Sequence, residues 1–91
     1  MRQTDYVITE HALFEMKRRG LTEEMVHMVM SSPGQRVDVR PGRVVMQTAL
    51  HMDEPEKTYL VRVIVDVDRK PAEVVTVYRT SRISKYWRQE P

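Results

Sequence analysis

The stretch "QRVDVRPGRVVMQTALHM", residues 35–52, decides the fold. Apolar and polar side chains alternate on both sides of Pro41-Gly42, and a period of two is typical of strands with one face in solvent. A proline followed by a glycine suits the two central positions of a type II turn. The stretch therefore predicts a β-hairpin with strands over 35–40 and 43–52.

A second hairpin signal follows in the last third of the chain. The segments "TYLVRVIVDV" (58–67) and "AEVVTVYRT" (72–80) flank a short "DRKP" turn, and the polar segment "DEPEK" (53–57) links the two hairpins. Valine-rich strands bounded by turn residues indicate four strands, which we expect to form one antiparallel sheet.

The first third of the chain has helical periodicity. After a short extended start at residues 6–8, Thr9 is placed to cap a helix that runs to about Arg19, and Gly20 ends it. Thr22 opens a second helix in the same way. The buried positions that we expect in these helices are Ala12, Leu13, Met16, Met25, Val26, Met28 and Val29.

The order of elements predicts an α+β fold in which two N-terminal helices pack on one face of a four-stranded antiparallel sheet. The register of each hairpin then decides what the other face presents. A turn centred on Pro41-Gly42 pairs Val39 with Val44, and matching valines in the second hairpin sets Arg62 beside Tyr78. The open face then carries Arg36, Arg40, Arg43, Gln47, His51, Arg62, Tyr78 and Thr80.

Composition limits the class of protein. The chain has 91 residues, no cysteine, a net charge of +2, and 41% hydrophobic and 31% charged residues, as expected for one folded domain over residues 1–91. The lack of cysteine excludes disulfides, thiolate metal sites and cysteine nucleophiles. No apolar run reaches the roughly 20 residues of a membrane span, and the N-terminus does not resemble a signal peptide. We therefore expect a cytoplasmic protein with no membrane partner.

Positive charge is concentrated in residues 31–48 and 71–91, and the predicted register brings both segments to the open face. Guanidinium groups bind phosphates and aromatic rings stack on unpaired bases, so this face suits RNA. The alternative is a solvated surface, because the open face of an antiparallel sheet is polar in any case.

His11 is the histidine with the most suggestive surroundings. It lies in the first turn of the first helix beside Glu10 and Glu15, where a carboxylate can orient an imidazole for acid–base chemistry. The alternative is a surface histidine at a helix start. The spacing of the three histidines does not match a metal-binding motif, so we expect no metal and no cofactor.

The ending "SRISKYW" (81–87) predicts a short turn capped by Ser81. Ile83, Tyr86 and Trp87 fall on one side at helical spacing, so we expect them to pack on the body of the protein as a clasp. The cations Arg82, Lys85 and Arg88 then remain in water, and Lys85 is the one with the strongest functional interest.

Three stretches together resemble a known family: "HALFEMKRRGLTEEMV" (11–26), "YLVRVIVD" (59–66) and "EVVTVYRTSRISKYW" (73–87). They are similar to the family called domain of unknown function 4258, and the similarity covers nearly the whole chain. That family in turn resembles the RelE-like and contact-dependent-toxin ribonucleases. These are small proteins with two helices and a sheet. Some are metal-independent enzymes that cut RNA, and some are proteins that an antitoxin partner neutralises. The resemblance implies a RelE-like fold.

The resemblance also implies roles for individual residues. The reaction would be attack of the RNA 2′-hydroxyl on the adjacent phosphate, which needs a base, an acid and a cation that stabilises the phosphorane. His11 would be the base or the acid, Arg62 with Arg79 or Lys85 would stabilise charge, and Tyr78 and Thr80 would position the phosphate. The implied catalytic set is His11, Arg62, Tyr78, Thr80 and Lys85, and the RNA-binding set is Arg36, Arg40, Arg43, Arg79 and Arg82.

Three functional hypotheses remain open. The first is a small metal-independent ribonuclease, the toxin of a toxin–antitoxin pair, with RNA as substrate and an antitoxin protein as partner. The second is a non-catalytic RNA- or protein-binding module on the same fold. The third is an oligomerisation domain that pairs through an edge strand, which would form a homodimer.

Overall fold

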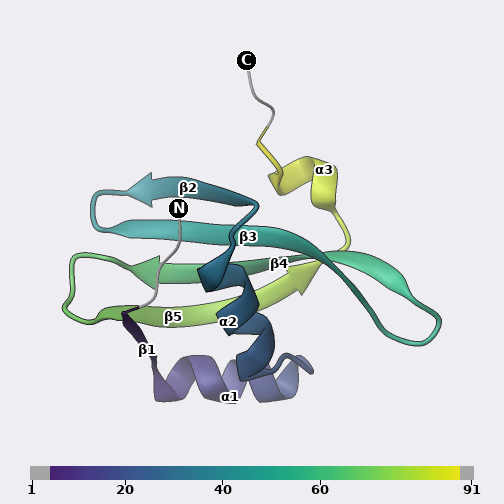
Figure 1. The fold of residues 1–91 in the computed structure, drawn as a ribbon, viewed down its shortest axis with the longest axis horizontal. Helices are drawn as coiled ribbons and strands as arrows, with labels where there is room; N and C mark the ends of the chain where they lie inside the picture. The colour runs from purple at the N-terminus through teal and green to yellow at the C-terminus, as the bar shows by residue number, and fades with distance from the viewer. Residues whose placement is uncertain (1–4, 89–91) are drawn as a thin grey trace.

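The computed structural model describes residues 5–88, which form three helices and one five-stranded sheet (Figure 1). The elements in chain order are β1 (Tyr6–Ile8), α1 (Glu10–Arg18), α2 (Glu23–Ser31), β2 (Gln35–Arg40), β3 (Arg43–Met52), β4 (Lys57–Asp66), β5 (Ala72–Thr80) and α3 (Ile83–Tyr86). The order of strands across the sheet is β1-β5-β4-β3-β2. None of the helices within residues 5–88 is long and apolar enough to cross a bilayer.

The α+β class is confirmed, but the predicted four-stranded antiparallel sheet is incomplete. Strands β2 to β5 pair antiparallel, as expected, and β1 adds a fifth strand parallel to β5, with Tyr6 opposite Ala72 and Ile8 opposite Val74. A three-residue strand is too short to show a period, and its partner is more than sixty residues away in the sequence. No local sequence pattern therefore predicts the pairing of β1 with β5.

Both predicted helix starts are confirmed. The Thr9 hydroxyl accepts a hydrogen bond from the Ala12 N–H (3.1 Å), and the Thr22 hydroxyl accepts one from the Met25 N–H (3.2 Å). Each threonine thus satisfies a backbone donor that has no partner within its own helix. Gly20, with φ of 68°, follows the C-cap residue Arg19 and ends α1, as the sequence predicts.

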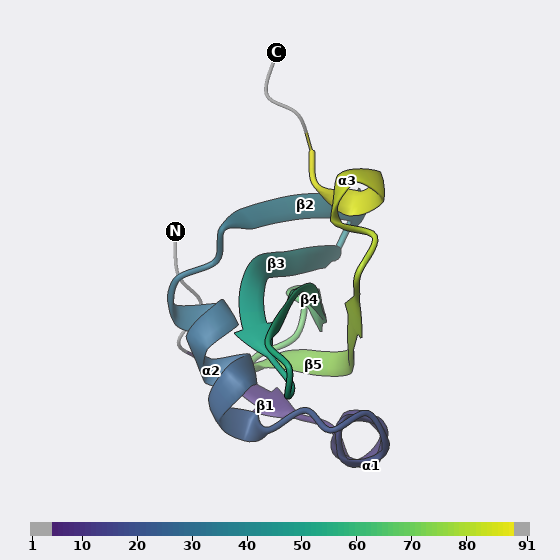
Figure 2. The same ribbon diagram turned by 90° about the vertical axis from the view of Figure 1, so that its right-hand side faces the viewer.

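The two helices do not share one face, contrary to the prediction. Figure 2 shows α2 on one side of the sheet, α3 on the other, and α1 along the edge below β5. Because β1 pairs only with residues 72–74, the rest of this edge is available to α1. The Thr9 N–H donates to the Val74 carbonyl (3.1 Å) and Arg19 Nη1 donates to the Val77 carbonyl (2.9 Å), which fixes α1 along β5.

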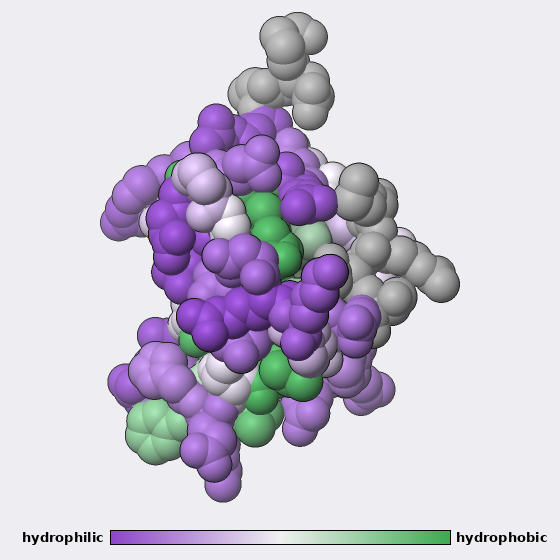
Figure 3. Space-filling model, turned by 90° about the vertical axis from the view of Figure 1, so that its left-hand side faces the viewer, coloured by the Kyte–Doolittle hydropathy of each residue, from purple (hydrophilic) through white to green (hydrophobic). Residues whose placement is uncertain are grey.

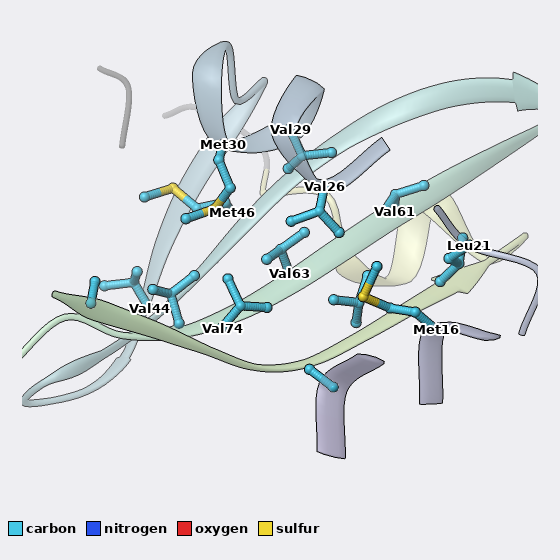
Figure 4. Close-up of a cluster of buried hydrophobic side chains, with 14 residues drawn as sticks. Met16, Leu21, Val26, Val29, Met30, Val44, Met46, Val61, Val63 and Val74 are labelled. Atoms are coloured by element: carbon cyan, nitrogen blue, oxygen red, sulfur yellow. The ribbon is translucent and has the colours of Figure 1, made fainter. Parts of the chain in front are cut away.

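The core lies between α2 and the sheet and extends to the buried face of α1, where Ala12 and Met16 join it (Figure 4). On α2 the buried residues are Val26, Val29 and Met30, a spacing of three and four that places one stripe against β3 and β4. The expectation for Met28 is wrong, because its side chain points to solvent and is 55% exposed. Leu13 on α1 is also exposed, at 38%.

The register of the second hairpin is confirmed in the middle of the strands: Arg62 lies opposite Tyr78 and Val63 opposite Val77. Beyond Ile64 an irregularity shifts the pairing, so that Val65 lies opposite Val74. The face opposite α2 therefore carries Arg62 and Tyr78, as predicted.

The predicted register of the first hairpin is wrong by one residue. A bulge between Asp38 and Arg40 removes Val39 from the pairing, and its side chain is 56% exposed. The residue opposite Val44 is therefore Asp38. Arg36 lies opposite Met46, on the same side of the sheet as α2, so the prediction that it belongs to the open face is wrong. An inserted residue reverses the alternation of side chains, and no local residue type marks it.

The end of the molecule that carries the β2–β3 and β4–β5 turns is mostly hydrophilic. Figure 3 shows this end, where apolar surface is divided into small separate patches. The two turns contact each other, since the Val67 N–H donates to the Gly42 carbonyl (2.9 Å) and Asp68 lies against Gly42. The turns thus brace the sheet at the end opposite the β3–β4 turn.

Gly42 provides a test of this brace. Its φ of 85° fits the third position of a type II turn, and a Cβ added there would lie 2.6 Å from Asp68 Oδ2. Gly20 also has positive φ, but nothing lies within 4 Å of an added Cβ. We expect Gly20→Ala to lower the free energy of unfolding by about 1 kcal/mol and Gly42→Ala by about 2–3 kcal/mol.

Urea denaturation of the two variants measures this difference. Because both substitutions have a similar backbone cost, the excess loss in Gly42→Ala reports the contact between the two turns. Equal losses would show that Asp68 moves aside at no cost and that the contact contributes nothing.

Candidate functional site

Arg62 is the centre of the face opposite α2. It extends from the middle of β4, between Gln47 on β3 and Tyr78 on β5. Its Nε donates to Gln47 Oε1 (2.8 Å) and its Nη1 donates to the Tyr78 hydroxyl (2.5 Å). Both partners are neutral, and no ion pair to Arg62 occurs within residues 5–88. The half-buried guanidinium therefore keeps an uncompensated positive charge.

Two tyrosine rings surround this guanidinium. Its Cζ lies 4.4 Å from the ring centroid of Tyr86 on α3 and 5.7 Å from that of Tyr78. The two rings meet edge to face, with centroids 6.5 Å apart and an interplanar angle of 76°. Cation–π contacts of this kind contribute about 0.5–2 kcal/mol each, depending on how dry they are. They hold the cation in place without cancelling its charge.

Gln47 joins Arg62 to the C-terminal segment. Its side chain is fully buried, and its Nε2 donates to Gln35 Oε1 (2.8 Å) and to the Tyr86 carbonyl (3.1 Å). Gln35 in turn forms two hydrogen bonds with the backbone of Arg88, donating to its carbonyl (2.6 Å) and accepting from its N–H (2.9 Å). A chain of amide groups thus connects the middle of the sheet to residues 86–88.

The predicted clasp is present. Ile83, Tyr86 and Trp87 are half-buried, and a Cβ added to Gly34 would lie 2.9 Å from Trp87 Cη2, so the indole packs directly on that glycine. The cations at 82, 85 and 88 are exposed, as expected. The predicted cap is wrong, because the hydroxyl of Thr80, and not that of Ser81, accepts from the Arg82 N–H (3.1 Å).

A positively charged cleft lies on the other side of Tyr78. It is open, has a volume of about 630 Å³, and is lined by Arg18, Arg19, Gly20, Tyr78 and Arg79. Glu15 pairs with both helix arginines, at 2.6 Å and 3.2 Å, and Arg79 pairs with Asp53 at 3.0 Å. Three guanidinium groups therefore share two carboxylates, so the cleft carries excess positive charge.

The structure brings together only part of the predicted catalytic set. Arg62 and Tyr78 are in contact, and Lys85 Nζ lies 5.3 Å from the Tyr86 ring that also covers Arg62. Thr80 follows on the same strand, opposite Leu60. His11 is not part of this group. It is exposed at the N-terminal end of α1, about 12 Å of helix axis from Arg19 at the cleft.

The predicted RNA-binding set is dispersed. Arg43 is bound in bidentate fashion by Asp66 (2.6 and 3.0 Å), and Arg40 lies opposite Arg43 near the β2–β3 turn. Arg36 is on the α2 side of the sheet, and Arg82 is exposed where α3 begins. Arg79 lines the cleft, and its guanidinium also lies 4.6 Å from the ring centroid of Tyr59.

Sequence reasoning missed three contributors to the site: Gln35, Arg18 and Arg19. It placed Gln47 on the open face, as observed, but assigned it no role. A glutamine within the apolar run "VVMQTAL" is a detectable anomaly, because a buried amide requires partners. The run "KRRG" at the end of the first helix is an equally visible cluster of charge. What the sequence does not reveal is that the end of α1 reaches Tyr78, because this depends on α1 lying at the edge of β5.

Comparison with known proteins identifies the family. Residues 8–79 match the family model described as Domain of unknown function (DUF4258), and the chain belongs to this family. No curated protein and no solved structure matches the chain. The matched range includes Gln47, Arg62 and Tyr78 and ends before α3. Within residues 5–88 no group of three or more His, Cys, Asp or Glu side chains is arranged to hold a metal ion.

The Arg43–Asp66 pair makes stability depend on pH in a predictable direction. The hydrogen bond from Arg43 lowers the pKa of Asp66 below its ordinary value of about 3.9. A lowered pKa means that the stabilisation is complete above pH 4–5, where the carboxylate is ionised in both states, and is lost as the pH falls through the folded pKa.

We therefore expect Asp66→Asn to be less stable than the native protein at pH 7, with the difference shrinking toward pH 2. Chemical denaturation at several pH values measures this dependence. Asp38→Asn, at an exposed aspartate on β2, is the control for the loss of one carboxylate and is expected to keep native stability at pH 7. A constant difference between Asp66→Asn and the native protein from pH 7 to pH 2 would contradict this account of Asp66.

Proposed function

We propose that the protein binds single-stranded RNA on the face of the sheet opposite α2. One observation carries the proposal: Arg62 is half-buried, held by two neutral side chains and flanked by two tyrosine rings, with no carboxylate partner within residues 5–88. A guanidinium that is held in place without an ion pair can bind an anion from another molecule. The two rings favour an anion that is attached to a nucleobase.

The chemistry of RNA fits the surroundings of Arg62. A phosphate accepts two parallel hydrogen bonds from a guanidinium, and unpaired bases stack on aromatic rings for about 1–3 kcal/mol each. Beyond Tyr78, the arginines of the cleft offer charge to a neighbouring phosphate. The contrasting explanation, a solvated polar surface, does not account for a buried glutamine that orients the arginine.

Binding of a fluorescent oligouridylate tests the proposal. We expect Arg62→Ala to weaken binding about tenfold to a hundredfold, since a hydrogen bond to a charged group contributes about 1.5–3 kcal/mol. Arg62→Lys keeps the charge but loses the planar fork, so we expect an intermediate loss.

Arg69→Ala is the matched control for this experiment, because Arg69 is exposed and pairs with Glu73 outside the cluster. Circular dichroism verifies that each variant is folded. Equal weakening by Arg62→Ala and Arg69→Ala would indicate general charge attraction and would reject the site at Arg62.

A second candidate function is cleavage of the bound RNA, and the hydroxyl of Tyr78 favours it. This oxygen accepts a hydrogen bond from Arg62, which leaves the phenolic hydrogen to be donated to a ligand. In the proposed reaction the 2′-oxygen bonds to phosphorus, its proton passes to water, and the bond to the 5′-oxygen breaks. Tyr78 donates its proton to that leaving oxygen, and Arg62 stabilises the phosphorane.

This second candidate corresponds to a RelE-like ribonuclease that needs no metal. The order of two helices followed by antiparallel strands supports a RelE-like fold. In that case the protein acts in the cytoplasm as the toxin of a toxin–antitoxin pair, and its partners are RNA and an antitoxin protein. Its acid would be Tyr78 rather than His11, because His11 lies at the far end of α1.

Incubation of the protein with oligouridylate in EDTA tests cleavage. We expect products that end in a 2′,3′-cyclic phosphate. Tyr78→Phe should reduce the rate of cleavage about a hundredfold or more, well beyond its loss of affinity from the missing bond to Arg62. His11→Ala is the control and is expected to cleave at the native rate. RNA that is bound but stays intact would reject cleavage and leave the binding function standing.

A further inference from the structure

Arg62 differs from the other well-anchored arginines in the chemistry of its partner. Arg18, Arg19, Arg43, Arg69 and Arg79 each lie within 4.0 Å of a carboxylate oxygen. Beside Arg62 the corresponding partner is the amide of Gln47, whose Oε1 accepts a hydrogen bond from Arg62 Nε at 2.8 Å. We propose that Gln47 is a positioning residue that fixes the Arg62 guanidinium while leaving its charge to an RNA phosphate, an inference that rests on the proposed function.

The hydrogen bonds of Gln47 require an amide. One oxygen accepts from Arg62, and one nitrogen donates to both Gln35 Oε1 and the Tyr86 carbonyl. A carboxylate of the same shape can accept from Arg62 but cannot donate, so it would face two carbonyl oxygens without a hydrogen between them. An apolar side chain would leave the Arg62 Nε–H without its partner. Among side chains of this length, only glutamine meets all three demands.

The same contacts connect the two parts of the site. Gln47 is fully buried, so solvent does not compete for its hydrogen bonds. Its oxygen orients the guanidinium from the sheet, and its nitrogen holds the carbonyl of Tyr86, whose ring covers that guanidinium from α3. The position of the cation and the position of the ring therefore depend on one side chain.

Gln47→Glu is the decisive substitution. The introduced carboxylate forms an ion pair with Arg62 and neutralises it, so we expect oligouridylate affinity to fall at least tenfold, as in Arg62→Ala. The slope of log affinity against log salt concentration should become less steep by about 0.7, which is the contribution of one phosphate contact on a single strand. The double variant Arg62→Ala/Gln47→Glu should lose less affinity than the sum of the two single losses, because both changes remove the same contact.

Two further variants separate positioning from folding. Gln47→Met removes the amide without adding charge, so we expect weaker binding with the native salt slope. Gln35→Leu loosens residues 86–88 but keeps the Arg62–Gln47 bond, so we expect a lower thermal midpoint with the native salt slope. A salt slope in Gln35→Leu as low as in Gln47→Glu would overturn the inference, because Gln47 would then act only by holding the C-terminal segment.

An NMR titration of the introduced carboxyl gives a readout independent of RNA. In Gln47→Glu the ion pair should hold the pKa of this carboxyl below the ordinary value of about 4.3, and in the double variant the lowering should be absent. An unlowered pKa in Gln47→Glu would overturn the inference.

The outcomes for the two proposals are distinct. If the native protein retains oligouridylate through Arg62, and Gln47→Glu binds with native affinity and slope, the role of Gln47 is rejected and RNA binding stands. If the native protein does not retain oligouridylate, RNA binding is rejected, and the inference falls with it even where the carboxyl pKa is lowered.

Discussion

The site depends on one arrangement, a half-buried guanidinium held by neutral groups. Removing a charge from water is costly unless hydrogen bonds and nearby charges replace the lost hydration. Elsewhere in the chain that compensation comes from carboxylates, as in the bidentate Arg43–Asp66 pair. At Arg62 it comes from an amide, a phenol and two aromatic rings, which orient the cation but leave its field intact. The neighbouring strands and α3 are arranged so that all of these groups meet at one residue.

How far the sequence predicts this site varies from one residue to the next. The contact of Arg62 with Tyr78 follows from valine alternation, because a one-residue slip would bury an arginine in the core. The same reasoning fails for Arg36, because the bulge at Val39 reverses the pattern and leaves no local trace. The same reasoning does not predict the fifth strand or the position of α1, since both depend on the parallel pairing of β1 with β5. Local periodicity therefore predicts the pairs of a hairpin where no bulge interrupts them, but not the bulges or the placement of separate elements.

The C-terminal segment extends the site beyond the range that identifies the family. The DUF4258 match ends at residue 79, whereas the ring over Arg62 comes from Tyr86 and the backbone bound by Gln35 comes from Arg88. Arg62, Gln47 and Tyr78 lie within the matched range, on the three inner strands of the sheet. The part of the site on α3 is attached through side-chain amides and one indole, so it is the part held by fewer contacts.

The helix along β5 has a consequence for how the sheet can grow. A strand edge offers unpaired backbone groups to any other chain, and sheets with two such edges can stack end to end without limit. Here α1 lies along β5 beyond the short β1, and Arg19 already occupies the carbonyl of Val77. Within residues 5–88, the strand edge on that side is therefore limited to the three residues of β1, whereas β2 presents six residues on the other side. Pairing with a strand of another chain over more than three residues is favoured at β2.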